Sequence, residues 1–245
     1  MSEIPEFLDQ EPSQYSRDEP MPWYQVWIAA LTKPNEQTFR DIAAQSNAKP
    51  GTAYLWIFIS YLVTFIIVVG AQAAIGFPNI ARQLSDYGMG DFPVEDMGGF
   101  LIGALVIAPF VAGIVVLFFM LSTALIQWIA SLFGGTGSYA TLVYPFGAIY
   151  APFMLASAMM SLLGLIPFIG MCFGIISIGI WVYQIVLQVL VVKAVNDLDT
   201  GKAAGAVLLP GLVLFVFVCC CLIIGLAAAG PIIGEVFSEI NQGLY

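Results

Sequence analysis

The side chains best suited to chemistry in this sequence are a few amides inside apolar segments. Gln184 and Gln188 are four positions apart, which places both amides on one face of a helix. Such a face either bonds to neighbouring helices or forms a polar path for a solute. We favour interhelical hydrogen bonds, because no intramembrane carboxylate or cation accompanies the two amides. Gln72 and Gln127 are isolated and are interpreted in the same way.

The cysteines do not form a metal-binding or disulfide pattern. Cys219, Cys220 and Cys221 are consecutive, and successive helical residues point about 100° apart, so three thiols cannot converge on one ion. We interpret them as small apolar side chains. The sequence predicts no metal site and no cofactor site.

A catalytic set is also missing. The chain has 0 histidines, which removes the commonest general base. The run Gly134-Gly135-Thr136-Gly137 is glycine-rich but lacks the lysine and the preceding strand of a phosphate-binding loop. We therefore predict no catalytic residues and a protein that is not an enzyme.

The composition indicates a membrane protein. Of the 245 residues, 60% are hydrophobic and 9% are charged, against roughly 25% charged in a soluble domain. No Asp, Glu, Lys or Arg lies between Asp96 and Lys193, or between Lys202 and Glu235. Charges avoid hydrocarbon, where each costs about 3 kcal/mol or more. The net charge of −9 argues against a nucleic-acid partner.

Five apolar stretches are each long enough to cross a bilayer. They cover about residues 54–75, 100–133, 144–163, 166–192 and 206–230. The prediction is an all-α polytopic membrane protein with a five-helix bundle over 54–234 and a short tail over 235–245. Glycine pairs four positions apart predict close helix approach within the chain: Gly99 and Gly103, Gly170 and Gly174, and Gly230 and Gly234.

The region before the bundle divides into two parts. Residues 1–22 are acidic and proline-rich, which predicts a disordered tail. Residues 23–53 are predicted to hold amphipathic interfacial helices. In the first helix one apolar stripe is expected, with Trp23 and Trp27 as anchors at headgroup level. The stripe consists of Trp23, Val26, Trp27, Ala30 and Leu31.

A second short helix is expected after Pro34, with Asn35 as an alternative N-cap. Phe39 and Ile42 continue the apolar stripe, while Glu36 and Arg40 are spaced to form an ion pair outside it. Two interpretations remain open for both helices and are compatible with each other: the helices lie on the membrane surface, or they pack against the ends of the bundle.

Lysine and arginine predict the orientation. Five spans place six of the seven on the amino-terminal side and Arg82 alone on the other. The amino terminus is therefore expected in the cytoplasm and Tyr245 outside. The six residues are Arg17, Lys33, Arg40, Lys49, Lys193 and Lys202.

Several short motifs resemble one family. They are Lys33-Pro34-Asn35-Glu36-Gln37-Thr38-Phe39-Arg40, Gly135-Thr136-Gly137-Ser138-Tyr139, Tyr144-Pro145-Phe146-Gly147-Ala148-Ile149-Tyr150-Ala151-Pro152, Lys193-Ala194-Val195-Asn196 and Gly201-Lys202-Ala203. Over roughly residues 22–230 the chain resembles a prokaryotic member of the Yip family, the Ypt/Rab-interacting membrane proteins. The motif residues singled out are Gly135, Gly137, Tyr139, Tyr144, Pro145, Gly147 and Pro152.

The resemblance implies five helices, a cytoplasmic amino terminus, a prokaryotic plasma-membrane location and no known catalysis. It also implies a membrane-protein or small GTPase-like partner besides the lipid bilayer, because eukaryotic members are linked to Rab GTPases. We expect a non-enzymatic protein that organises membranes or binds other proteins. The alternative is a small-solute transporter or channel component, for which prolines 145 and 152 would bend the third span around a cavity.

Overall fold

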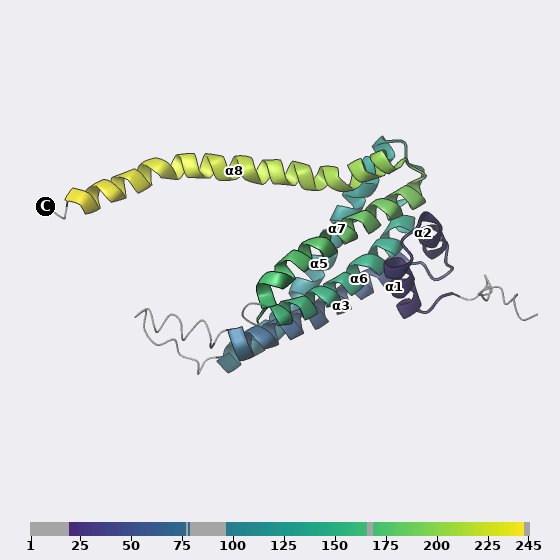
Figure 1. The fold of residues 1–245 in the computed structure, drawn as a ribbon, viewed down its shortest axis with the longest axis horizontal. Coiled ribbons are helices and arrows are strands. Elements are labelled where there is room, and N and C mark those ends of the chain that lie inside the picture. Colours follow the sequence, from purple (N-terminus) through teal and green to yellow (C-terminus); the bar gives the residue numbers. More distant parts are fainter. Residues whose placement is uncertain (1–19, 77, 79–96, 166–168, 243–245) are drawn as a thin grey trace, which may run out of the picture.

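The chain folds into helices only, over the residues that the computed structural model describes: 20–76, 78, 97–165 and 169–242. Figure 1 shows their arrangement. In chain order they are α1 (Trp23–Thr32), α2 (Glu36–Ala43), α3 (Pro50–Ala71), the π-helical turn η1 (Gln72–Gly76), α5 (Met97–Leu132), α6 (Tyr139–Gly164), α7 (Ile169–Asn196) and α8 (Thr200–Gln242). Most of the predicted acidic tail, and Arg82, lie outside the described residues.

Five of these helices are long and apolar enough to cross a membrane, which confirms the all-α polytopic prediction. The five spans are Pro50–Gly76, Leu101–Leu132, Tyr139–Gly164, Phe173–Asn196 and Thr200–Ile223. Helices are the expected solution here, because a bilayer offers no water to satisfy backbone amides and carbonyls. The protein is an integral membrane protein.

The boundaries of the helices differ from those of the five apolar stretches in the sequence. α6 begins at Tyr139, five residues before the stretch predicted from 144, because Ser138 caps it: the Ser138 side chain accepts from the Thr141 amide, and the Thr141 hydroxyl accepts from the Ser138 amide. α8 continues to Gln242, through most of the predicted tail 235–245. Hydropathy marks the residues that suit lipid, whereas capping and backbone chemistry set where a helix ends.

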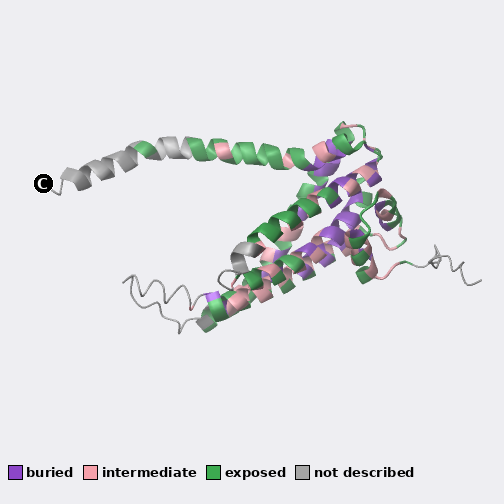
Figure 2. Cartoon of the chain, viewed as in Figure 1, coloured by how far each residue is buried: buried purple, intermediate pink, exposed green. Residues whose placement is uncertain are grey.

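The core is concentrated at one end of the bundle, which we call the docked end. There α2, the α5–α6 connection (residues 133–138) and the α7–α8 junction (residues 193–203) meet, and buried residues cluster around them (Figure 2). α6 lies centrally, packed on α3 and α7. α8 contacts α7 and α5 near its start and then diverges from the bundle (Figure 1).

The predicted glycine contacts are wrong where the structure tests them. A Cβ added at Gly99, Gly103, Gly174 or Gly230 would meet no atom within 4 Å. A four-residue spacing alone does not show which face of a helix meets a neighbour. Close approach occurs instead at Gly147, where a Cβ would lie 2.6 Å from the Ala53 Cβ on α3.

Candidate functional site

Helix α1 is apolar on two faces rather than one. Val26 and Ala30 are fully buried against the bundle. Trp23, Tyr24 and Ile28 face outward and are 55%, 48% and 57% exposed. The single stripe expected from the sequence is therefore divided: Trp23 belongs to the outer face, while Val26 and Ala30 dock the helix.

A series of aromatic rings joins α1 to the centre of the bundle. Trp23 lies edge-on to Trp27 at a centroid distance of 4.9 Å, and Trp27 lies edge-on to Trp56 of α3 at 5.8 Å. Trp56 in turn lies 4.9 Å from Tyr144 of α6. Such pairs stabilise by about 0.5–1.5 kcal/mol each beyond their buried area. The predicted anchor Trp27 thus packs mainly against protein.

Helix α2 is amphipathic in the way the sequence predicts. Its N-cap is Asn35, whose side chain accepts a 2.7 Å hydrogen bond from the Thr38 amide. Phe39 and Ile42 are fully buried. Of the two interpretations left open by the sequence, the structure shows packing against the bundle for both short helices.

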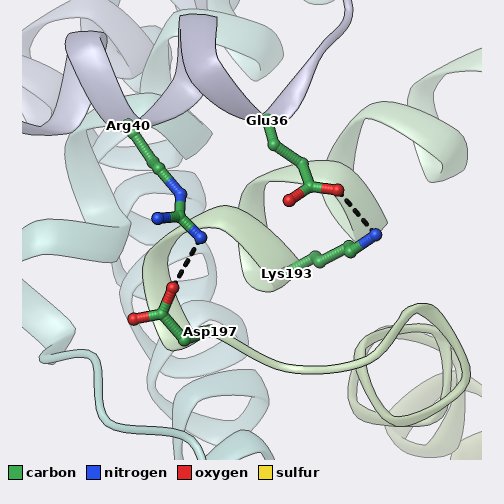
Figure 3. A network of polar contacts seen from close by, with 4 residues as sticks. All are labelled: Glu36, Arg40, Lys193 and Asp197. Atoms are coloured by element: carbon green, nitrogen blue, oxygen red, sulfur yellow. Dashed lines mark hydrogen bonds and ion pairs between the residues drawn. The ribbon is translucent and has the colours of Figure 1, made fainter.

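Two ion pairs connect α2 to the end of α7 (Figure 3). The Arg40 guanidinium lies 2.5 Å from the Asp197 carboxylate, and the Lys193 ammonium lies 2.6 Å from the Glu36 carboxylate. The predicted pair between Glu36 and Arg40 is wrong, because Glu36 turns to Lys193 on α7 and Arg40 turns to Asp197, which directly follows α7. The Arg40–Asp197 pair is 48% and 60% exposed, so it adds little stability, whereas Lys193 of the second pair is only 26% exposed.

A buried amide pair fastens the α5–α6 connection to the end of α7. The Gln127 Nε2 donates to the Gly137 carbonyl and to the Asn196 Oδ1, both at 2.8 Å. The Asn196 Nδ2 donates back to the Gln127 Oε1 at 3.2 Å. The Thr136 amide also donates to the Asn196 carbonyl. Asn196 is fully buried, so these bonds replace the water it would otherwise need.

Gly135 and Gly137 allow this contact because they have no side chain. A Cβ on Gly137 would lie 2.5 Å from the Val195 carbonyl oxygen, and one on Gly135 would lie 2.8 Å from the Asn196 Oδ1. Real Cβ atoms do not approach so closely. The two motif glycines are therefore positions where the backbone of the connection touches α7 directly.

The remaining motif residues line the packing surface of α6. Tyr139 shares a 3.0 Å hydrogen bond with the Tyr54 hydroxyl of α3. Tyr144, Pro145 and Gly147 are buried, and Pro152 is half-buried. Tyr139, Tyr144 and Gly147 thus meet α3 as a helix-packing surface.

The two predicted glutamines have different environments, although both face α6. Gln188 is buried and paired with the side chain of Tyr150. Gln184 lines a groove between the α6 and α7 halves remote from the docked end, and has no hydrogen-bond partner among the described residues. This α6–α7 groove is open to the surroundings and has a volume of about 500 Å³. Its lining residues are Ser157, Met160, Ser161, Gly164, Phe173, Gly174, Ser177, Ile180, Trp181 and Gln184.

Two functional contacts could not be identified from the sequence. Gln127 is isolated in the sequence, yet Asn196, 69 positions away, pairs with it. The Tyr183 hydroxyl of α7 donates to the Leu31 carbonyl at the end of α1, at 2.6 Å. The only sequence signal was a polar residue, Asn196, at the end of an apolar helix. Among the described residues, no group of three His, Cys, Asp or Glu side chains could hold a metal ion.

Comparison with known proteins identifies the family through the same residues. The family model described as the Yip1 domain matches residues 28–222, which include α2, the glycine connection, the α6 motif and most of the spanning helices. No curated protein and no solved structure matches the chain. The chain belongs to the Yip1 domain family of membrane proteins.

Proposed function

We propose that this protein is a non-enzymatic membrane-organising protein that acts through helix α1. The supporting observation is the outer face of α1, where Trp23, Tyr24 and Ile28 are exposed while Val26 and Ala30 hold the helix on the bundle. Indole and phenol rings favour the boundary between headgroups and acyl chains. A helix fixed at that level on one side of the bilayer occupies area in one leaflet only.

The position of α1 along the bundle supports this proposal. The Leu31 carbonyl meets Tyr183, which lies about 20 Å along α7 from Asn196 at a rise of about 1.5 Å per residue. α1 therefore lies against the side of the bundle, and its end at Leu31 points from the docked end toward the acyl region of the leaflet. Because α1 and α2 are fastened by buried contacts and by the ion pairs of Figure 3, the protein would be wider in this leaflet than in the other.

The charges at the docked end support a cytoplasmic orientation. Its exposed cations include Lys33, Arg40, Lys49 and Lys202. Cytoplasmic loops carry an excess of such residues, and anionic headgroups attract them. The amino terminus would then be cytoplasmic, with the carboxyl end on the opposite side. Cleavage by a protease added to sealed, right-side-out vesicles should spare α2, and cleavage there would contradict the proposed orientation.

Serine substitution of the outer face tests the function directly. Deleting residues 23–47 would uncover the core around Phe39 and Ile42, so its effect would not be specific. The variant Trp23→Ser, Tyr24→Ser, Ile28→Ser keeps the docking face intact. We expect the wild-type chain to narrow the size distribution of reconstituted vesicles and the triple variant to lose that effect.

The matched control for this experiment is Gln37→Ser with Asp41→Ser on the exposed face of α2, where the two side chains bond only to each other. Vesicle sizes measured by electron cryomicroscopy should be the same for control and wild type. Equal vesicle sizes for the triple variant and the wild type would contradict the proposal.

Recognition of a protein partner is a further part of this proposal. Family membership supports a membrane-protein or small GTPase-like partner at the cytoplasmic docked end. Cross-linking of the native protein in its membrane, followed by purification and identification of attached chains, tests this part. A stoichiometric partner would support it, and self-links alone would contradict it.

The second candidate is a small-solute transporter or channel component. The α6–α7 groove favours it, because Gln184 presents there an amide that has no partner in the described part of the chain. Gln188 no longer supports it, since Tyr150 occupies that amide. Replacing Gln184 with Leu should abolish the flux of an uncharged polar solute into proteoliposomes, and flux that persists would contradict a transport role for this residue.

A further inference from the structure

We propose that the α6–α7 groove binds an uncharged lipid that carries a free hydroxyl group, such as a diacylglycerol. Its volume of about 500 Å³ lies within the range of small-molecule sites. It extends from Phe173 to Gln184, about 16 Å along α7 at a rise of about 1.5 Å per residue. Trp181 lines it and is 63% exposed, so the groove opens on the outer surface of the helices, which faces lipid.

The serine oxygens of the groove are free to accept hydrogen bonds from a ligand. Ser157 and Ser161 of α6 each donate to a carbonyl one turn earlier in the same helix, at 2.8 and 2.9 Å. Ser177 of α7 does the same at 2.8 Å. A hydroxyl that donates in this way keeps its oxygen lone pairs as acceptors. The three serines therefore offer acceptors to a ligand that brings its own O–H group.

The side-chain amide of Gln184 would be stabilised by a hydrogen bond from a ligand. Its amide lies within a span and has no partner among the described residues, and an unsatisfied polar group is costly in hydrocarbon. A hydroxyl group satisfies it by donating to the amide oxygen and accepting from the amide nitrogen.

The charge of the ligand follows from the sequence. None of the residues that line the groove is charged, so a phosphate or ammonium group would find no counter-ion among them. This distinguishes a neutral hydroxyl lipid from an ordinary phospholipid.

Helix α8 of the same chain does not provide the missing group. Between Thr200 and Ser238 its sequence has no hydroxyl or amide side chain. Its apolar residues, such as Leu212, Phe215 and Phe217, are exposed to the surroundings. At mid-span, packing α8 into the groove would offer Gln184 only the thiols of Cys219, Cys220 and Cys221, which form weak hydrogen bonds.

Photolabelling of the full-length protein in phosphatidylcholine vesicles tests the assignment. The probe is a diacylglycerol with a diazirine in one acyl chain, and labelled peptides are located by mass spectrometry. We expect labelling of α6 and α7 residues that line the groove. Gln184→Leu removes the amide and should reduce labelling about three- to tenfold. Gly174→Leu fills open space in the groove and should reduce it at least as much.

Two matched controls make the result specific. Gly179→Leu adds the same side chain to an exposed position of α7 that has equally open space but does not line the groove, and labelling should be unchanged. A phosphatidylcholine with the same diazirine chain should label the groove weakly. Equal labelling by both probes, or unchanged labelling in Gly174→Leu, would overturn the proposal. Displacement of the probe by aqueous glycerol would assign the groove to a soluble polyol and overturn a lipid ligand.

Discussion

The docked end and the α6–α7 groove use the same polar group, a glutamine amide within a span, in opposite ways. At the docked end Gln127 makes three hydrogen bonds, to Gly137 and Asn196, in a site from which water is excluded. In the groove Gln184 makes none with described residues and lies beside about 500 Å³ of open space. A satisfied buried amide fixes one structure, whereas an unsatisfied one leaves a site for something else.

The difference extends to the glycines of the two regions. Gly135, Gly137 and Gly147 lie where a Cβ would collide with a neighbouring chain segment. Gly164 and Gly174 line the groove, and a Cβ there would meet no atom within 4 Å. Glycine at the docked end permits contact, and glycine in the groove preserves space. Stability should therefore respond to substitutions at the docked end, and ligand occupancy to substitutions in the groove.

Substitution at the α3–α6 contact should have the largest effect on stability. Gly147→Ala places a Cβ 2.6 Å from that of Ala53, and relieving such a contact costs about 1–3 kcal/mol. Unfolding by sodium dodecyl sulfate in mixed micelles, followed by circular dichroism, measures the free energy. Gly113→Ala is the control, because it is also within a span but has open space around it. Equal stability of the two variants would contradict the packing described for α6.

Removing one partner of the buried amide pair should come next. Asn196→Ala leaves the Gln127 amide buried without its partner, which we expect to lower the free energy of unfolding by about 1–3 kcal/mol. The double variant Gln127→Leu, Asn196→Leu should lose less than the sum of its single variants, because neither amide is then orphaned. Additive losses in the same unfolding assay would show that the two side chains are not coupled.

Breaking an exposed ion pair should have a smaller effect. Arg40→Ala removes the contact with Asp197, whose groups are 48% and 60% exposed, so we expect a loss of at most about 0.5 kcal/mol. The difference from wild type should shrink further as salt is added to the unfolding assay, because salt screens exposed charges. A larger loss that salt does not change would mean that Arg40 acts through packing.

The smallest effect on stability is expected in the groove. Gln184→Leu removes an amide that has no partner among the described residues, so the free energy of unfolding should stay unchanged or rise slightly. The matched substitution Gln127→Leu should destabilise in the same experiment. Similar losses for the two glutamines would remove the distinction between the docked end and the groove.

The sequence alone determined the class of fold and the number of spans. A long uncharged segment is too apolar to lie in water, whatever packs beside it. The five spans, the N-cap at Asn35 and the burial of Phe39 and Ile42 therefore followed from local chemistry. The motif residues of α6 were also found, although their role in packing was not.

Which polar groups meet depends on how the helices pack in three dimensions. Within a span nearly every residue is apolar, so hydropathy does not show which face packs on protein and which on lipid. The helices that supply these contacts are far apart in the sequence. Gln127 pairs with Asn196, and Glu36 and Arg40 pair with charges at the end of α7 rather than with each other. The same holds for Gln184 and Gln188, which are four residues apart on one face. Of the two, Gln188 pairs with Tyr150 on the neighbouring helix, and Gln184 has no such partner among the residues that the structure describes.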